Sequence, residues 1–218
     1  MSQISYTKEF FMLAVNEKGK IPALKSIEIY GCLLAGSLME LMNEGMIVKD
    51  EKGRFSAAKK FDENFAYLYP LYERIATSKK PKNMEKIAAD YLSGGKHTEL
   101  LLTAFRESLV TKNYKDELNN QGLFKNKTLY IPKFEAIQKI VSKIRKQFFG
   151  TIQLEDETIC LVALLEASKL THEYFGKIDT KLLKKHLEEL PASGTHALAK
   201  ELIESTLVMM SVITAVVT

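Results

Sequence analysis

Four histidines are the side chains of this sequence that could exchange a proton near neutral pH. They are scattered along the chain, as His97, His172, His186 and His196. None belongs to a His-Glu-x-x-His motif or to a Cys/His spacing that would bind zinc. Glu173 directly follows His172 instead of lying one helical turn away, so the local sequence does not orient the imidazole as a base. The pattern favours surface or rim histidines over a catalytic or metal site.

Other motifs that could carry chemistry are also incomplete. The segment GCLLAGS, residues 31–37, has the spacing of a phosphate loop but lacks its lysine and lies within a helical pattern. We interpret its glycines as allowing close helix packing. The chain contains neither Gly-x-Ser-x-Gly nor Gly-x-Gly-x-x-Gly. Cys32 and Cys160 lie in apolar runs, as buried and reduced thiols do. We therefore expect no enzymatic activity, no cofactor and no metal, and an enzyme of another type is kept as an alternative.

Basic residues only slightly outnumber acidic ones. The 218 residues include 31 Lys and Arg against 27 Asp and Glu, which gives a formal net charge of +4. This balance permits an anionic partner without requiring one. Proteins that bind nucleic acid non-specifically concentrate their basic residues more strongly, so nucleic acid is the less favoured partner.

Residues 134–149, FEAIQKIVSKIRKQFF, form the most informative charged segment. Helical spacing places apolar side chains on one face, namely Phe134, Ile137, Val141, Ile144 and Phe148. Another face carries Lys139, Lys143 and Lys146. Such a helix suits a membrane surface or a phosphate backbone, although it is more often a solvated outer face. A second basic set comprises Arg106, Lys112 and Lys115.

Helical signals dominate the chain. We expect helices over residues 6–17, 26–44, 61–78 with an interruption at Pro70, 85–92, 97–120 as one or two helices, 134–149, 156–175, 180–190 and 195–217. Residues 78–83, SKKPKN, are expected to be a solvated linker. Turn signals at residues 50–53 and at 126–127 each separate two short apolar runs, which predicts two β-hairpins.

Two segments before these hairpins are almost copies of each other. ELMNEG begins at Glu40 and ELNNQG begins at Glu117. In both, we expect the leucine to anchor a helix and the glycine, Gly45 or Gly122, to end it. The expected fold is mainly α: a single compact helical domain over residues 1–218 with two small β-hairpins, each following a helix ended by glycine. The helix-hairpin units lie around 26–56 and 97–132, and a C-terminal helical core spans 134–218.

The C-terminal segment LIESTLVMMSVITAVVT is the strongest apolar stretch. It has 17 residues and includes Glu204, whereas a membrane span needs about 20 largely uncharged residues. We interpret it as a core helix, with a tail anchor as the alternative. The N-terminus MSQISYTKEFF has no export signal pattern, so a cytoplasmic location is expected.

Four segments taken together resemble the Golgi phosphoprotein 3 family: LLAGSLMELMNEGMI, DELNNQGLF, DETICLVALLEASKLTHEYF and SVITAVVT. The resemblance implies a mostly α fold, no enzymatic activity and peripheral membrane attachment. It also implies the properties of the eukaryotic members. Those bind phosphatidylinositol 4-phosphate through a tryptophan and three basic residues, use the second hairpin at the membrane and in self-association, and act as adaptors that retain glycosyltransferases.

The headgroup residues of the family do not carry over to this chain. There is no tryptophan, and its place falls near Leu24 and Lys25; the basic positions fall on Leu34 and near Ser108 and Thr111. We therefore expect general contact with anionic lipid headgroups rather than phosphoinositide specificity. The candidate headgroup residues, chosen by local charge, are Lys25, Arg106, Lys112 and Lys115. The candidate apolar wedge of the second hairpin is Leu123, Phe124, Leu129 and Tyr130.

The expected partners are an anionic phospholipid surface, a membrane or cytoplasmic client protein, and a second copy bound through the second hairpin. A winged-helix DNA-binding regulator is the main alternative, because a recognition helix followed by a hairpin is how that fold binds DNA. The helix before the first hairpin, LLAGSLMEL, is too apolar to enter a groove. The segment before the second hairpin, with Lys112, Asn113 and Lys115, is more polar and keeps the alternative open.

Overall fold

Helices make up most of the structure. The computed structural model describes residues 4–92, 95–110, 115–118, 129–190 and 196–217. The α-helices are α1 (Tyr6–Ala14), α2 (Ser26–Asn43), α3 (Tyr69–Ala76), α4 (Met84–Leu92), α5 (Lys96–Val110), α6 (Phe134–Phe148), α7 (Asp156–Ala167), α8 (Thr171–Tyr174), α9 (Lys177–Glu188) and α10 (Ala197–Val217). Two 3-10 helices are η1 (Ala23–Lys25) and η2 (Glu63–Leu68). The strands are β1 (Ile47–Lys49), β2 (Arg54–Ala57), β3 (Lys82–Asn83), β4 (Lys115–Leu118) and β5 (Leu129–Pro132). The mainly α fold is confirmed.

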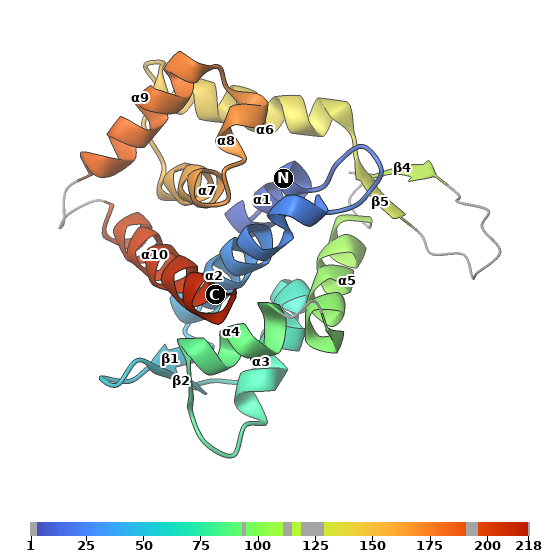
Figure 1. Ribbon diagram of the computed structural model, residues 1–218, viewed down its shortest axis with the longest axis vertical. Helices are drawn as coiled ribbons and strands as arrows, with labels where there is room; N and C mark the ends of the chain where they lie inside the picture. Colours follow the sequence, from blue (N-terminus) through green and yellow to red (C-terminus); the bar gives the residue numbers. More distant parts are fainter. Residues whose placement is uncertain (1–3, 93–94, 111–114, 119–128, 191–195, 218) are drawn as a thin grey trace.

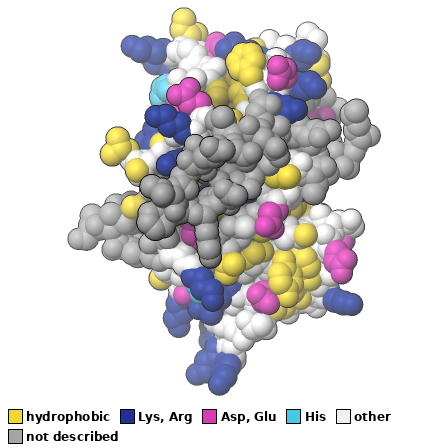
Figure 2. Space-filling view, turned by 90° about the vertical axis from the view of Figure 1, so that its right-hand side faces the viewer, with side chains coloured by type: hydrophobic (Ala, Val, Ile, Leu, Met, Phe, Trp, Pro, Cys, Tyr) yellow, Lys and Arg dark blue, Asp and Glu magenta, His cyan; other side chains and the backbone are white. Residues whose placement is uncertain are grey.

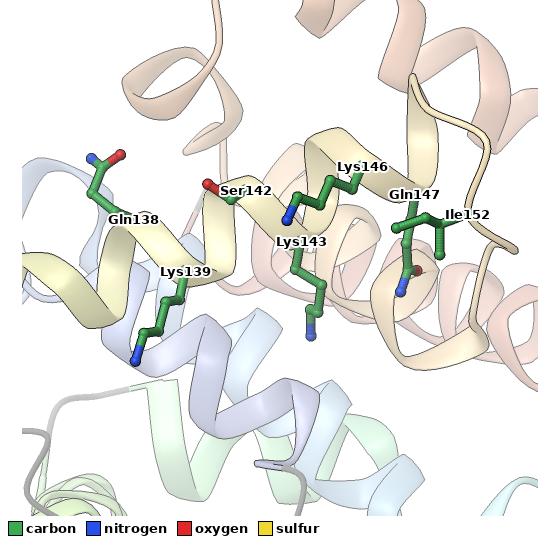
Figure 3. Close-up of a pocket in the computed structure, with 7 residues that line it drawn as sticks. All are labelled: Gln138, Lys139, Ser142, Lys143, Lys146, Gln147 and Ile152. Atoms are coloured by element: carbon green, nitrogen blue, oxygen red, sulfur yellow. The ribbon is translucent and has the colours of Figure 1, made fainter.

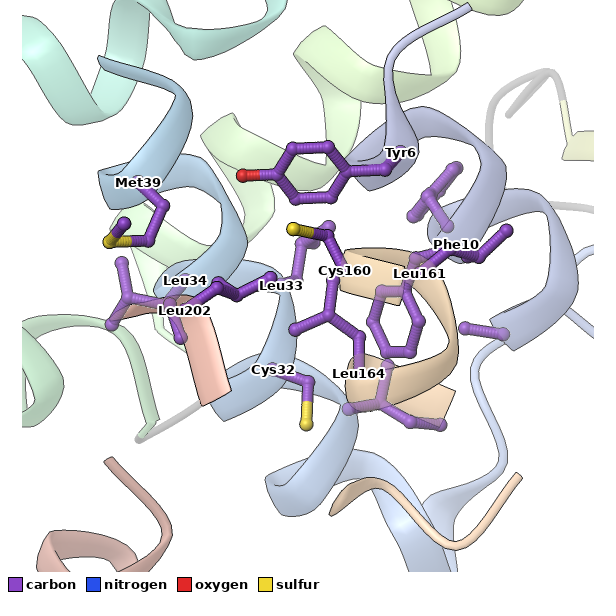
Figure 4. Close-up of a cluster of buried hydrophobic side chains, with 14 of the residues drawn as sticks. Tyr6, Phe10, Cys32, Leu33, Leu34, Met39, Cys160, Leu161, Leu164 and Leu202 are labelled. Carbon is purple, nitrogen blue, oxygen red and sulfur yellow. The ribbon is translucent and has the colours of Figure 1, made fainter. Parts of the chain in front are cut away.

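The core is built around α2 and α7, which are apolar on nearly every side. Both α1 and α10 pack on this pair, and α6, α8 and α9 cover α7 at one end of the molecule (Figure 1). Cys160 and Leu164 of α7 lie among Cys32 and Leu33 of α2 (Figure 4). Both cysteines are free and fully buried, as expected, and burial raises the pKa of each thiol.

Gly36 shows why small residues occur in the GCLLAGS segment. A Cβ atom at this position would lie 2.6 Å from Cγ2 of Thr7 on α1 and 3.1 Å from Cδ1 of Leu164 on α7. The Tyr6 hydroxyl also donates a hydrogen bond to the Gly36 carbonyl at 3.2 Å. Three helices therefore meet where only glycine fits, which confirms the packing interpretation of this segment.

The first helix-hairpin unit follows its sequence closely. α2 ends at Asn43, and Gly45 takes φ 65°, in the left-handed region that glycine tolerates. The hairpin turn is closed by the Asp50 carboxylate, which accepts hydrogen bonds from the backbone amides of Lys52 and Arg54, both at 2.9 Å. β1 and β2 then pair antiparallel, with Val48 opposite Ser56.

A third strand beside the first hairpin was not expected. Lys82–Asn83 forms β3 and pairs antiparallel with β2, so the linker prediction for residues 78–83 is wrong at this point. The reason is an ion pair: Lys82 Nζ lies 2.7 Å from Oδ2 of Asp90 on α4, which holds the segment beside the hairpin.

The second unit differs from the first. α5 ends at Val110, and Lys115–Leu118 is strand β4, paired antiparallel with β5 so that Glu117 lies opposite Tyr130. The prediction that Glu117 and Leu118 are helical is therefore wrong, and Gly122 lies outside the described residues. Glu40 and Leu41 belong to a helix with a buried apolar face, whereas the segment before Glu117 is polar and offers no such face.

The helices expected over residues 6–17 and 156–175 are shorter than predicted. α1 ends at Ala14, because the side chain of Asn16 accepts hydrogen bonds from the amides of Lys18 and Lys20 and forms a turn. The helix expected over 156–175 is broken into α7 and α8. Lys169, with φ 59°, is the left-handed residue between them.

The C-terminal helix α10 packs along α2 and α7, as expected for a core helix. Its inner side chains Leu202 and Met209 are fully buried, while Leu207 and Val208 are exposed. Within the described residues, no helix is long and apolar enough to cross a membrane.

Candidate functional site

The predicted headgroup residues do not form a free cationic cluster. Lys25 Nζ lies 2.5 Å from Oε1 of Glu173 on α8 and donates to the Lys169 carbonyl at 3.2 Å. Arg106 lies 3.7 Å from Glu99 on its own helix. Both cations are thus partly neutralised by carboxylates. Lys112 lies outside the described residues, and of Lys115 only the backbone, in β4, is described.

The positions that correspond to the family's headgroup residues are equally unsuited to a phosphate. Leu24, near the tryptophan position, is 97% exposed and carries no charge. Leu34 is fully buried in the core (Figure 4). The Ser108 hydroxyl donates to the Phe105 carbonyl of its own helix. Thr111 lies outside the described residues.

The proposed apolar wedge of the second hairpin is contradicted at Tyr130. This side chain is 1% exposed, and its ring centroid lies 5.9 Å from that of Phe11 on α1. Because Tyr130 is part of the core, it cannot contact a membrane. Leu129 begins β5, where only its backbone is described, and Leu123 and Phe124 lie outside the described residues.

Helix α6 is amphipathic, as its spacing predicts. The buried side chains are Ala136, Ile140, Val141, Ile144, Gln147 and Phe148. The prediction that Phe134 lies on the buried face is wrong. Phe134 is the first residue of the helix and is 70% exposed, because the neighbouring α7 does not reach that end. The buried face begins at Ala136 instead.

The predicted basic face of α6 is present and open to solvent. A shallow depression of about 500 Å³ lies on the outside of the helix (Figure 3). Its lining includes Lys139, Lys143, Lys146, Gln147 and Ile152. Lys139 and Lys146 are exposed and form no ion pair with any residue that the structure describes. An anion that binds them would therefore displace no carboxylate among the described residues.

Lys143 has a different role from its two neighbours. Its Nζ lies 2.5 Å from Oε2 of Glu9 on α1, and the Glu9 side chain is only 10% exposed. Burial raises the pKa of Glu9, and the neighbouring ammonium of Lys143 lowers it by less. Lys143 thus holds α6 on α1, which leaves two of the three predicted lysines for an external partner.

The histidines lie at the surface or rim, as expected. His172 and His186 are exposed, and His97 and His196 are half-buried. Nδ1 of His196 lies 2.6 Å from Oδ1 of Asp156, which joins the start of α10 to the start of α7. Among the described residues, no group of three or more His, Cys, Asp or Glu side chains is placed to hold a metal ion.

Helix α9 was given no functional role by its sequence pattern, although two large aliphatic side chains are exposed on it. Ile178 is 75% exposed and Leu182 is 41% exposed. Their spacing with Lys181 and Lys185 was the available signal, since all four fall on one side of a helix. The same spacing is also typical of an ordinary solvated helix face. The burial of Thr180 and Leu183 shows which side of α9 faces the core, and therefore that these four residues form an outer stripe of apolar and basic side chains.

The fold and this surface define a mainly helical protein with an open basic face. The sequence profile described as Golgi phosphoprotein 3 (GPP34) matches residues 7–209, nearly the whole chain. The chain therefore belongs to the Golgi phosphoprotein 3 family, which confirms the resemblance seen in its sequence. A comparison with curated proteins found no match.

Proposed function

We propose that this member of the Golgi phosphoprotein 3 family is a non-catalytic peripheral membrane protein that binds anionic phospholipid headgroups and acts as an adaptor for a second protein. The observation that carries the proposal is the open face of α6, where Lys139 and Lys146 are exposed and make no ion pair with a described residue. Membership of the Golgi phosphoprotein 3 family supports the same function.

The charges set the expected strength of binding. Near an anionic leaflet, each lysine contributes about 1 kcal/mol, so Lys139 and Lys146 contribute about 2 kcal/mol. The attraction is screened over a Debye length of about 8 Å at physiological salt. Binding through these lysines is therefore weak, reversible and salt-sensitive. General anionic-lipid contact fits better than a phosphoinositide pocket, because Lys25 and Arg106 are paired and Leu34 is buried.

The adaptor part of the proposal is supported by an apolar groove between α7, α9 and α10. The groove has a volume of about 460 Å³, and its apolar lining includes Ala163, Leu187, Ile203 and Leu207. Leu207 is 63% exposed. An exposed apolar groove of this kind suits the side chains of a client segment.

DNA binding through the first helix-hairpin unit is less well supported. A winged helix must present a recognition helix before its hairpin. In the first unit that helix is α2, where Leu33, Leu38 and Leu41 are buried in the core. α2 therefore has no free face to place in a groove.

Liposome co-sedimentation tests the membrane proposal. The protein is mixed with phosphatidylcholine vesicles, phosphatidylglycerol vesicles and phosphatidylinositol 4-phosphate vesicles, each at low and near-physiological salt. We expect binding to both anionic compositions, weakened by salt, and little binding to phosphatidylcholine. Equal binding to phosphatidylcholine, or none to any vesicle together with a shift of random duplex DNA, would contradict the proposal.

A charge-reversal pair identifies the lysines responsible. Lys139→Glu with Lys146→Glu should weaken binding to phosphatidylglycerol vesicles on the order of tenfold or more at low salt. The matched control is Lys79→Glu with Lys80→Glu, which makes the same change of charge on exposed lysines of the α3–α4 connection, at the opposite end of the molecule (Figure 1). The control should bind as the unmodified protein does.

A further inference from the structure

Charge alone gives weak adhesion, so a stable membrane contact needs an apolar component. Of the four hairpin residues that were expected to supply it, Tyr130 is buried, and the side chains of the other three are not described. The outer layer formed by α6 and α9 at one end of the molecule offers another source (Figure 1). Two contacts join these helices: Nη1 of Arg145 lies 2.8 Å from Oδ2 of Asp179, and the rings of Phe148 and His186 have centroids 5.9 Å apart.

The outward stripe of α9 combines apolar and basic side chains. Ile178, Lys181, Leu182 and Lys185 follow an i, i+3, i+4, i+7 spacing and so share one side of the helix. The opposite side, with Thr180 and Leu183, is buried. Lys181 forms no ion pair with a described residue, and Lys185 makes only a solvent-exposed contact of 3.6 Å with Glu189. The stripe is therefore both charged and accessible.

The two helices present this stripe as part of one continuous surface. Asp179 and His186 lie on the side of α9 that contacts α6. Leu182 lies between these two residues along the helix, so it lies at the edge of the stripe that is next to α6. Phe149, which directly follows α6 and lies one turn beyond Arg145, is 38% exposed. The exposed apolar side chains thus lie near the junction of the two helices.

Lysines flank this apolar strip on both sides. On the α6 side they are Lys139 and Lys146, and on the α9 side they are Lys181 and Lys185. Figure 2 shows the side of the molecule that faces away from α9, and at the α6 end of that side Lys and Arg side chains lie among hydrophobic and acidic ones. The surface therefore consists of an apolar strip between two basic ridges.

We propose that the outer surface of the α6–α9 layer is the membrane-docking platform, with Ile178 and Leu182 inserting among the headgroups of an anionic bilayer while the two lysine ridges bind lipid phosphates. The proposal rests on the function proposed above and names the surface that performs it. Its apolar contact does not depend on the second hairpin, whose Leu123 and Phe124 lie outside the described residues.

The chemistry favours a bilayer over other anionic partners. Helices that lie in a membrane interface combine aliphatic side chains with flanking lysines, because the apolar groups enter the acyl boundary while the ammonium groups stay at the phosphates. Protein interfaces are depleted in lysine at their centre. A nucleic-acid backbone would use the lysines but would leave the exposed Ile178 and Leu182 in water.

Fluorescence gives a direct test, because the chain contains no tryptophan. Ile178→Trp introduces a single reporter on the platform, and Val48→Trp places one at an exposed position of the first hairpin, at the other end of the molecule. With phosphatidylglycerol vesicles, the emission of Ile178→Trp should shift to shorter wavelength and be quenched by brominated acyl chains. The emission of Val48→Trp should not change.

Co-sedimentation of two further variants completes the test. Ile178→Ser with Leu182→Ser should lower the affinity for phosphatidylglycerol vesicles about tenfold or more, even at high salt. Lys181→Glu with Lys185→Glu should lower it about tenfold at low salt. All four side chains are exposed, so the variants should keep the thermal unfolding temperature of the unmodified protein.

The outcomes separate the two proposals. If the unmodified protein does not bind anionic vesicles, the proposed function fails and the platform fails with it. If it binds but the Ile178→Trp emission is unchanged, the platform is wrong while the function stands. Loss of binding to duplex DNA rather than to vesicles in the Lys181 and Lys185 variant would assign the surface to nucleic acid and would also overturn the platform.

Discussion

The Nζ atom of Lys143 on α6 lies 2.5 Å from Oε2 of Glu9 on α1, an ion pair between residues 134 positions apart in the chain. It fixes the helix that carries the open basic face to the helix at the start of the core. Of three lysines with the same spacing pattern, one therefore stabilises the fold and two are left for a partner.

Replacing Lys143 should cost stability. Lys143→Met keeps the apolar stem but leaves the largely buried Glu9 carboxylate without its cation. We expect a loss of about 1–2 kcal/mol at pH 7.5, between the values for exposed and buried ion pairs. Urea unfolding measures it. Lys139→Met, on the same face and without an ion pair to a described residue, is the control and should change stability by less than about 0.5 kcal/mol.

The cost of Lys143→Met should also depend on pH. Burial raises the pKa of Glu9, and Lys143 partly opposes that shift, so removing the lysine leaves the carboxyl more easily protonated. The loss should shrink as the pH falls and Glu9 takes up a proton. A loss that is the same at pH 4 and pH 7.5 would show that the ion pair is not its source.

Glu40 predicts a second pH dependence. This carboxyl is buried in α2 and accepts hydrogen bonds from the Tyr67 hydroxyl at 2.6 Å and the Thr7 amide at 3.3 Å. Burial raises the pKa of Glu40, and its hydrogen bonds lower it by less. Because the folded pKa lies above the unfolded value of about 4.3, the stabilising contribution is complete below that pH and is lost as the pH rises through the folded pKa.

Glu40→Gln should remove this dependence. The amide stays neutral and can keep accepting the Tyr67 hydrogen bond. Between pH 4.5 and pH 8, the free energy of unfolding of Glu40→Gln should therefore fall less steeply than that of the unmodified protein. Urea titrations across this range measure the difference. Parallel curves for the two proteins would argue against a raised pKa at Glu40.

The contribution of Asp90 to stability should depend on pH in the opposite direction from that of Glu40. Burial opposes its ionisation, but hydrogen bonds from Arg74 at 2.8 Å and Lys82 at 2.7 Å outweigh burial, and together they lower the pKa of Asp90. Its contribution is present above the unfolded value of about 3.9 and is lost as the pH falls through the lowered folded pKa.

Asp90→Asn should therefore destabilise the protein at pH 7 and matter little in strong acid. We expect about 1–2 kcal/mol at pH 7, because the pair is partly exposed and its full Coulomb energy is screened. Since Lys82 lies in β3 and Arg74 in α3, amide exchange in β3 should also become faster. An unchanged acid limb of the stability curve would contradict this role.

Gly36 predicts a steric effect. In Gly36→Ala the new methyl group would lie 2.6 Å from Thr7 Cγ2, so α1 must move away from α2. Overpacking of this kind costs about 1–3 kcal/mol. Gly176→Ala is the matched control, because nothing lies within 4 Å of its Cβ position and its φ of −67° suits any residue. The control should cost less than about 1 kcal/mol, and thermal unfolding compares the two.

Local sequence patterns correctly predicted the elements that are stabilised by contacts between residues close together in the chain. The first hairpin is an example, because Gly45, Gly53 and the Asp50 turn are set by backbone conformations and hydrogen bonds within a few residues. The amphipathic character of α6 was also predictable, since the 3.6-residue period is visible in the sequence. Its first residue, Phe134, was not, because exposure there depends on where α7 ends.

The near-copies at Glu40 and Glu117 show the limit of such patterns. The same residue types form the end of a buried helix in one place and strand β4 in the other, because α2 can bury an apolar face against α7 and α10. The pairing of Lys25 with Glu173, 148 residues away, is likewise invisible in a list of charges.

The sequence by itself determined the mainly helical class, the family, the buried cysteines and the basic face of α6. Only the tertiary structure decided that Lys143 is engaged by Glu9 while Lys139 and Lys146 remain open, that Tyr130 belongs to the core, and that α9 exposes Ile178 and Leu182 beside α6. The physical reason is that a periodic pattern states which side chains share a face, whereas burial and charge pairing depend on which distant element covers that face.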